Sequence, residues 1–275
     1  DGVRLHIHPF SCVDLSAPDT QDALAAAHDR TRRTAMEIMR TDSESKTEVQ
    51  GVVERYARRA PGSLYSILRP EVILSTQELQ RTMLFMLGSA CGYAADDLRT
   101  LKLVDVGCGY GGHLLDFLRF GFAPQNLRGI ELLPDRAAAA RAVLPEGIKV
   151  HGGDASEAGV APASQDVVFQ SVVFSSLLDD AFQEQLADRM WSWVRPGGGV
   201  LWYDFTMNNP RNPDVRGVPL KRVRALFPDG TIHSRRITLA PPIARRVAQL
   251  HPSLYTLFNG MPLLRTHVLC WIAKS

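Results

Sequence analysis

A glycine-rich turn constrains the fold of this chain more than any other feature. The segment Leu103–Gly112 joins a short apolar run, typical of a strand, to a run that predicts a helix ending near Phe120. Glycines permit a tight turn and let a ligand approach the backbone closely. The start of the helix offers unpaired N–H groups and the positive end of its dipole. The segment therefore predicts a ligand site where a strand meets a helix.

The spacing of Gly107, Gly109 and Gly112 also satisfies the pattern G-x-G-x-x-G. A single match of this kind is weak evidence, because it does not separate a pyrophosphate site from another nucleotide site. The residues around the turn are therefore needed to distinguish these two kinds of site.

The chain from residue 96 onward alternates short β-rich runs with helical runs. The predicted strands are 101–106, 127–131, 148–151, 166–171, 200–204, 231–239 and 266–273, and the main helices between them are 112–120, 134–144, 179–194 and one from about 242. Alternation of this kind predicts βαβ units and a parallel sheet. The two late strands suit an edge pair, one of them antiparallel.

Residues 1–95 have a different texture, with helices predicted from about Ser16 to Met39, over 44–59 and over 76–88. We therefore divide the chain into a helical N-terminal cap or lid at 1–95 and an α/β core at 96–275, with an insertion at about 205–230. Met83, Phe85 and Met86 recur at helical spacing and are predicted core or dimer-face residues.

Three acids stand at or near the ends of three successive predicted strands: Asp105, Glu131 and Asp154. Ligands bind at the carboxyl edge of open α/β sheets, and a carboxylate after the second strand can accept both hydroxyls of a ribose. Asp154 is placed to accept from an adenine amino group. Each acid has an alternative role as a helix cap or a solvated loop residue.

These residues, together with the later turn Val-Arg-Pro-Gly-Gly-Gly at 194–199, resemble a class I S-adenosylmethionine-dependent methyltransferase. The resemblance covers about Leu101 to Asp204. It implies a Rossmann-like seven-stranded sheet of order 3-2-1-4-5-7-6 with an antiparallel strand 7 at 266–273. It also implies that S-adenosylmethionine is the cofactor and S-adenosylhomocysteine the product. The cofactor-binding residues implied or expected are Asp105, Gly107, Cys108, Gly109, Glu131, Leu132, Asp154, Ala155, Gln170, Ser171 and Tyr65.

Two further segments, 169–179 and 202–217, are similar to a bacterial subgroup of this family. Members of that subgroup often lie among genes for surface polysaccharide or secondary metabolite biosynthesis. We therefore expect a small-molecule or sugar acceptor, methylated on a hydroxyl oxygen.

An alcohol must lose its proton when it is methylated, so a base assists the reaction. Asp204 is the candidate catalytic base and Tyr203 the candidate positioning group, because a polar run follows the apolar strand at this point. The alternative is that Asp204 caps the following turn. His233 and His267 are less favoured bases. His113 either lines the cofactor pocket or caps the helix.

The N-terminal helices of related methyltransferases form a lid over the cofactor and acceptor. Tyr56 and Tyr65 are candidates to cover the methionine end of the cofactor, and Arg58 or Arg81 to pair with its carboxylate. Ordinary helix packing and surface charge are the alternatives for all four residues.

The charge balance disfavours a nucleic-acid partner, since 31 Lys and Arg stand against 29 Asp and Glu. No apolar run reaches the roughly 18–20 residues that a membrane-spanning helix needs. We expect a cytoplasmic protein with reduced cysteines and no metal, because His6, His8, Cys12 and Asp14 lack a second ligand cluster. The apolar N-terminal helices are candidates for a homodimer interface.

Two other functions remain open on the sequence. The first is an NAD(P)-dependent oxidoreductase on a related sheet, which the acid before the glycine turn and Asp154 disfavour. The second is a catalytically inactive partner subunit that still binds the cofactor, because loss of turnover leaves no mark in these motifs.

Overall fold

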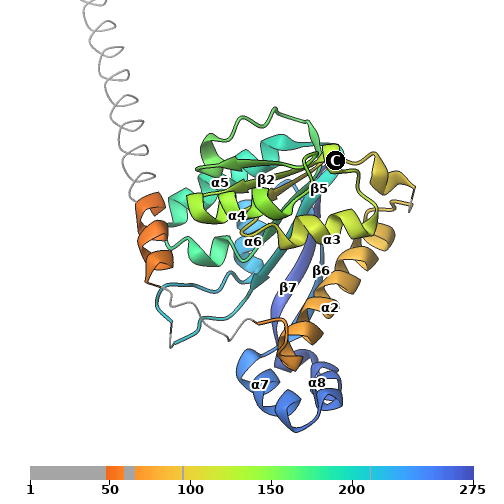
Figure 1. The fold of residues 1–275 in the computed structure, drawn as a ribbon, viewed down its shortest axis with the longest axis vertical. Coiled ribbons are helices and arrows are strands. Elements are labelled where there is room, and N and C mark those ends of the chain that lie inside the picture. The colour runs from red at the N-terminus through yellow and green to blue at the C-terminus, as the bar shows by residue number, and fades with distance from the viewer. Residues whose placement is uncertain (1–47, 59–65, 95, 211) are drawn as a thin grey trace, which may run out of the picture. The chain divides into compact units, whose positions relative to one another are not determined.

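The computed structural model describes residues 48–58, 66–94, 96–210 and 212–275 (Figure 1). The helix expected from Ser16 to Met39 and the candidate lid residue Tyr65 lie outside these residues, as does the His6, His8, Cys12 and Asp14 group. In the part of the chain described here, no helix is long and apolar enough to cross a membrane.

The described residues form a seven-stranded sheet of order β3-β2-β1-β4-β5-β7-β6. The strands are β1 (Leu103–Val106), β2 (Leu127–Glu131), β3 (Lys149–Gly152), β4 (Gln165–Ser171), β5 (Val194–Phe205), β6 (Thr231–Leu239) and β7 (Arg265–Ala273). The pairs among β1 to β5 are parallel, whereas β7 is antiparallel to both β5 and β6. This confirms the predicted strand order and the antiparallel strand 7.

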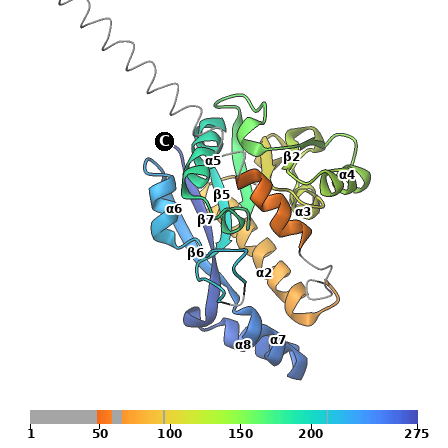
Figure 2. The same cartoon turned by 90° about the vertical axis from the view of Figure 1, so that its left-hand side faces the viewer.

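Helices cover both faces of the sheet, as Figures 1 and 2 show. On one face lie α2 (Pro70–Phe85), α3 (Gly112–Phe120) and α4 (Pro134–Val143), which bury Met83, Phe117 and Ala140 against it. On the other lie α5 (Asp180–Trp193) and α6 (Leu220–Leu226), which bury Met190 and other apolar side chains. Two buried layers on a central sheet account for the apolar strands that the sequence contains.

A helical pair, α7 (Pro241–Leu250) and α8 (Pro252–Asn259), connects β6 to β7. Because β6 runs parallel to β5, this connection lies at the carboxyl edge of the parallel strands, next to α2 (Figure 1). The buried carboxylate of Glu78 on α2 accepts hydrogen bonds from the Thr238 backbone at 3.0 Å and from the Asn259 amide at 2.7 Å. It thereby joins α2, β6 and α8.

Strand β5 is longer than the sequence indicated. We expected a turn at 194–199 followed by a strand from Val200, but β5 already begins at Val194. The residues of the expected turn instead form an irregular part of β5, where its pairing with β4 shifts register between Gln165 and Val167. Gly198 packs against backbone carbonyl oxygens of β4, where a side chain would not fit. The helix α6 was not predicted either.

Candidate functional site

The glycine turn connects β1 to α3. In the sheet, β1 lies between β2 and β4, so the chain adds β2 and β3 on one side of β1 and β4 and β5 on the other. The backbone nitrogens of Gly107 and Cys108 both donate to the carbonyl oxygen of Ile130, at 2.8 and 3.0 Å. Gly107, Gly109 and Gly111 have positive φ angles of 70°, 56° and 84°. These angles explain the glycines, since other residues rarely adopt them.

The two glycines of the turn face different surroundings. A Cβ atom on Gly107 would stand 2.5 Å from the Cγ2 atom of Val173, so this position has no room for a side chain. A Cβ atom on Gly109 would meet no atom within 4 Å. The turn therefore leaves open space beside Gly109. Cys108, in contrast, is buried with its sulfur against Gly129, so only its backbone can face a ligand.

Glu131 ends β2 and is nearly fully buried. Its Oε2 atom accepts from the Gly109 nitrogen at 2.8 Å, and its Oε1 atom accepts from the Leu133 nitrogen at 2.9 Å. Each carboxylate oxygen has a second lone pair, so the group can accept two more hydrogen bonds. The acid therefore holds the glycine turn and still has capacity for a pair of hydroxyl groups.

Asp105 is the other acid beside the turn. Its side chain is fully buried, and neither carboxyl oxygen has a hydrogen-bond partner among the described residues. Burial raises its pKa to about 7, an effect that His113 opposes and Glu131 reinforces through their charges. Burying a carboxyl group without a hydrogen-bond donor is energetically costly. A bound ligand that supplies a donor or a positive charge would therefore stabilise this group.

The end of β3 lies next to the end of β2, because the Gly153 nitrogen donates to the Glu131 carbonyl oxygen at 2.9 Å. Asp154 caps the short helix η5 (Ala155–Glu157), accepting from the Ser156 nitrogen at 2.8 Å. The capping alternative from the sequence therefore describes one of its contacts. Leu132 and Ala155 are half-buried and pack against the core on the α5 face.

The end of β4 carries local strain. Val172 has a φ angle of 55°, which is unusual for a β-branched residue. Gln170 holds this point in place: its amide nitrogen donates to the Tyr203 carbonyl oxygen at 3.2 Å, and its amide oxygen accepts from the Val173 nitrogen at 3.0 Å. Strain of this kind is found preferentially at functional sites. Gln170 is itself completely buried, and Ser171 is half-buried.

Comparisons with known proteins agree with this geometry. Residues 103–198 match the family model described as a methyltransferase domain. This matched segment is a class I S-adenosylmethionine-dependent methyltransferase domain. Its cofactor is S-adenosylmethionine, which becomes S-adenosylhomocysteine on transfer. No curated protein matches the chain.

Solved methyltransferase structures share the fold. A candidate sarcosine dimethylglycine methyltransferase from Galdieria sulphuraria is 17% identical, with 74% of this chain and 87% of that chain covered and a TM-score of 0.51. The 1,6-didemethyltoxoflavin-N1-methyltransferase of Burkholderia thailandensis is 17% identical, with 79% and 92% covered and a TM-score of 0.50. A methyltransferase from Archaeoglobus fulgidus is 12% identical, with 70% and 94% covered and a TM-score of 0.50.

The residues present in the methyltransferase domain fit this cofactor. Glu131 has unused acceptor capacity for ribose hydroxyls, Gly109 has open space beside its backbone, and Asp105 is a buried carboxyl without a donor. When bound, S-adenosylmethionine supplies an electrophilic methyl group on a positively charged sulfur. The chain itself has to bind it, orient the acceptor and exclude water.

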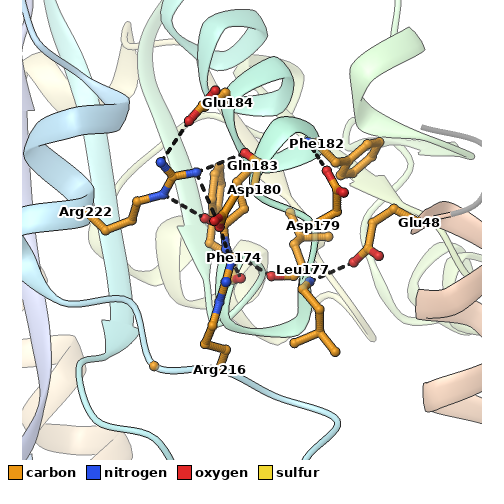
Figure 3. A network of polar contacts seen from close by, with 12 residues as sticks. Glu48, Phe174, Leu177, Asp179, Asp180, Phe182, Gln183, Glu184, Arg216 and Arg222 are labelled. Atoms are coloured by element: carbon orange, nitrogen blue, oxygen red, sulfur yellow. Dashed lines mark hydrogen bonds and ion pairs between the residues drawn. The ribbon is translucent and has the colours of Figure 1, made fainter. Parts of the chain in front are cut away.

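The segment after β4, residues 172–179, forms hydrogen bonds with side chains from several other elements (Figure 3). Gln183 of α5 donates to the carbonyl oxygens of Phe174 and Leu177. Glu48, in the helical stretch 48–57, accepts from the Leu178 nitrogen at 2.8 Å. Asp179 caps α5, accepting from the Phe182 nitrogen. The backbone of this segment is thus held by side chains from both of its sides.

Asp204 belongs to the same arrangement. It is completely buried, and its oxygens accept from the Ser175 nitrogen at 3.1 Å and from its neighbour Phe205 at 2.9 Å. Burial raises its pKa to about 7, against the effect of these hydrogen bonds. The geometry therefore gives Asp204 a structural contact of the kind that the capping alternative describes.

Tyr203 and Asp204 point to opposite faces of the sheet, because side chains alternate along a strand. Tyr203 packs on the α2 face, where its hydroxyl lies 2.8 Å from the Thr238 hydroxyl. The ring of His267 stacks on it at 5.1 Å. The structure thus separates the two candidate catalytic residues and brings His267, a less favoured candidate, beside Tyr203. His233 is exposed on β6.

The helical stretch 48–57 contacts the segment after β4 through the side chains of Arg55 and Tyr56 as well as Glu48. Arg55 donates to the Ser176 carbonyl oxygen at 3.0 Å and pairs with Glu48 at 2.7 Å. Tyr56, a candidate lid residue, lies with its hydroxyl 3.3 Å from the Ser176 hydroxyl. Arg58 instead pairs with Asp214.

Arg136 of α4 is a residue that sequence reasoning missed. Its guanidinium lies 4.5 Å from the ring centre of Tyr56 and 5.3 Å from that of Tyr110, which belongs to the glycine turn. A cation between two aromatic rings is recognisable only in three dimensions. The other candidate lid arginine, Arg81, is exposed on α2.

Proposed function

We propose that this chain transfers the methyl group of S-adenosylmethionine to a hydroxyl oxygen of a small-molecule or sugar acceptor. The single observation that carries the cofactor half of this proposal is the joint geometry of Glu131 and the glycine turn. The acceptor half rests on the side chains at the carboxyl ends of β4 and β5 and at the amino end of β7, which is antiparallel to β5.

A charged amine acceptor calls for a free carboxylate. The carboxylates of the elements that meet at this edge already accept hydrogen bonds or ion pairs within the protein: Glu48, Glu78, Asp179, Asp204 and Asp214. A charged amine would therefore have to share one of these carboxylates with its present partner. This supports a neutral acceptor over a charged one.

A hydroxyl acceptor needs a group that takes its proton. Asp204 is our candidate from the sequence, but it is completely buried and both of its oxygens already accept from backbone nitrogens, those of Ser175 and Phe205. His267 is the alternative base: burial lowers its pKa to about 4, which leaves the imidazole neutral at neutral pH but also makes it a weak proton acceptor. Tyr203 then orients His267 through the stacked rings.

The segments 169–179 and 202–217 support the narrower proposal of a bacterial enzyme of surface polysaccharide or secondary metabolite biosynthesis. The Burkholderia methyltransferase is, by its name, an N1-methyltransferase. Nitrogen methylation is therefore the rival outcome that an experiment has to separate from oxygen methylation.

The test uses S-adenosylmethionine labelled with carbon-13 in its methyl group, offered with sugars, hydroxylated aromatic compounds and amines. The carbon shift of the product distinguishes an O-methyl from an N-methyl group. We expect O-methyl products that require Glu131, so that Glu131→Gln reduces them and the exposed control Glu146→Gln does not. Transfer to amines alone would contradict the hydroxyl acceptor.

A further inference from the structure

Two buried polar groups beneath the glycine turn make no hydrogen bond with the described residues, although the Nδ1 atom of His113 lies 3.5 Å from a carboxylate oxygen of Asp116. Both carboxyl oxygens of Asp105 are buried without a hydrogen bond among the described residues, and so is the Nδ1 atom of His113. His113 is the second residue of α3, and its ring packs edge-on against Phe169, the β4 residue that pairs with Asp105. The two groups therefore share the α3 face of the sheet, directly before the turn.

An ionised carboxylate in this position would be buried without a counter-charge or a donor, which is strongly unfavourable. The titratable groups around it do not supply one. Glu131 on β2 adds negative charge, and Cys108 in the turn is a buried thiol. On α3, the Asp116 carboxylate lies 3.5 Å from the Nδ1 atom of His113 and accepts from Gln80, so it offers Asp105 neither a donor nor a positive charge. Among the residues that the structure describes, His113 is the group whose charge lowers the pKa of Asp105.

We propose that Asp105 carries a proton in the free protein and releases it to solvent when the ammonium group of the cofactor's methionine end binds beside it. This rests on the proposed function, since it concerns the same cofactor. The neutral carboxylic acid becomes a carboxylate paired with the ligand cation, and one proton passes to the buffer. Cofactor binding and proton release are thereby coupled.

The coupling fixes a pH dependence with a definite sign. Burial raises the pKa of Asp105 to about 7, and a nearby cation lowers it again. Below neutral pH the site must lose a proton in order to bind, so affinity falls as pH falls. Proton release should therefore be greatest below pH 7 and should fall toward zero as the pH rises above it.

Calorimetric titration with S-adenosylhomocysteine measures this directly. The enthalpy is compared in phosphate and in Tris at one pH, because the difference in buffer ionisation enthalpy reports the protons released. The matched ligand is methylthioadenosine, which keeps the adenosine and the thioether but lacks the amino acid end. We expect proton release with S-adenosylhomocysteine and none with methylthioadenosine. Equal release with both ligands, or none with either, would overturn the proposal.

Two variants assign the proton to one residue. Asp105→Asn should bind S-adenosylhomocysteine without releasing a proton, whereas His113→Gln should release more at pH 7, because the opposing charge is gone. Release that persists in Asp105→Asn and disappears in His113→Gln would overturn the assignment. If Asp105→Asn does not fold, the two ligands on the unaltered protein still decide the question.

The two proposals fail in different ways. Binding of S-adenosylhomocysteine without proton release removes only this inference, while absence of binding removes the proposed function as well.

Discussion

The Oε2 atom of Glu131 lies 2.8 Å from the backbone nitrogen of Gly109. The acid at the end of β2 thus fixes the turn that follows β1, across two neighbouring strands. A residue expected to hold the ribose of the cofactor also sets the shape of the loop that we expect to contact the cofactor. Binding and loop geometry therefore depend on one side chain.

The two glycines of the turn should respond differently to alanine. Gly107→Ala places a methyl group 2.5 Å from Val173, so we expect it to cost about 1–3 kcal/mol of stability beyond the backbone strain. Gly109→Ala meets no protein atom, and we expect only the left-handed backbone cost of about 1–2 kcal/mol. Chemical denaturation measures both.

The same pair separates folding from binding. The Gly109→Ala methyl group enters the open space beside the turn, so affinity for S-adenosylhomocysteine should fall more than stability does. Unchanged affinity in this variant would show that the cofactor does not lie against Gly109.

Asp204 should matter for stability through the Ser175 nitrogen. Asp204→Ala leaves that buried N–H without an acceptor, which costs roughly 1–3 kcal/mol. Asp204→Asn keeps one oxygen and should lose less. Thermal unfolding of the two variants gives the comparison, and an alanine variant as stable as the unaltered protein would remove this contact from the account.

Asp105 should make stability depend on pH. Its pKa is raised to about 7 in the folded protein, against about 3.9 in an unfolded chain, so the folded state binds more protons between these values. The free energy of unfolding therefore falls as pH rises through this window. Asp204 contributes in the same direction.

Asp105→Asn removes one of these two groups. We expect a shallower decline between pH 4 and 7 and a more stable protein than the unaltered one at pH 8, measured by urea denaturation. The exposed acid in Asp229→Asn serves as the matched control. A stability profile of Asp105→Asn that parallels the control would contradict the assignment.

Glu78 should stabilise the helical pair α7–α8. Glu78→Ala leaves the Thr238 nitrogen and the Asn259 amide without an acceptor, at roughly 1–3 kcal/mol for each donor. The exposed control Glu157→Ala should stay within about 0.5 kcal/mol of the unaltered protein. A guanidinium titration that finds the two variants equal would show that Glu78 is dispensable.

The sheet and the cofactor side could be predicted because their signals are local. Strand ends, the glycine turn, Glu131 and Asp154 follow one another at short sequence distances, and each strand end marks the same edge of a parallel sheet. The boundaries were less accurate: β5 begins six residues before the expected Val200, because a strand irregularity absorbs the Pro-Gly segment.

The acceptor side could not be predicted in the same way. Its contacts join residues far apart in the chain, such as Glu48 with Leu178 and Arg216 with Asp180. The alternation of a strand also set Tyr203 and Asp204 on opposite faces, although they are adjacent in sequence. The positions of Arg136 and His267 depend on contacts with aromatic rings that cannot be predicted from the spacing of residues in the sequence.

Calorimetric titration with S-adenosylhomocysteine tests the central claim most directly. The unaltered protein should bind it saturably, and Glu131→Gln should weaken binding about 10- to 100-fold, because hydrogen bonds to a charged acceptor contribute about 1.5–3 kcal/mol. The exposed Glu146→Gln should bind like the unaltered protein. No binding of S-adenosylhomocysteine, with saturable binding of a nicotinamide dinucleotide instead, would contradict the account.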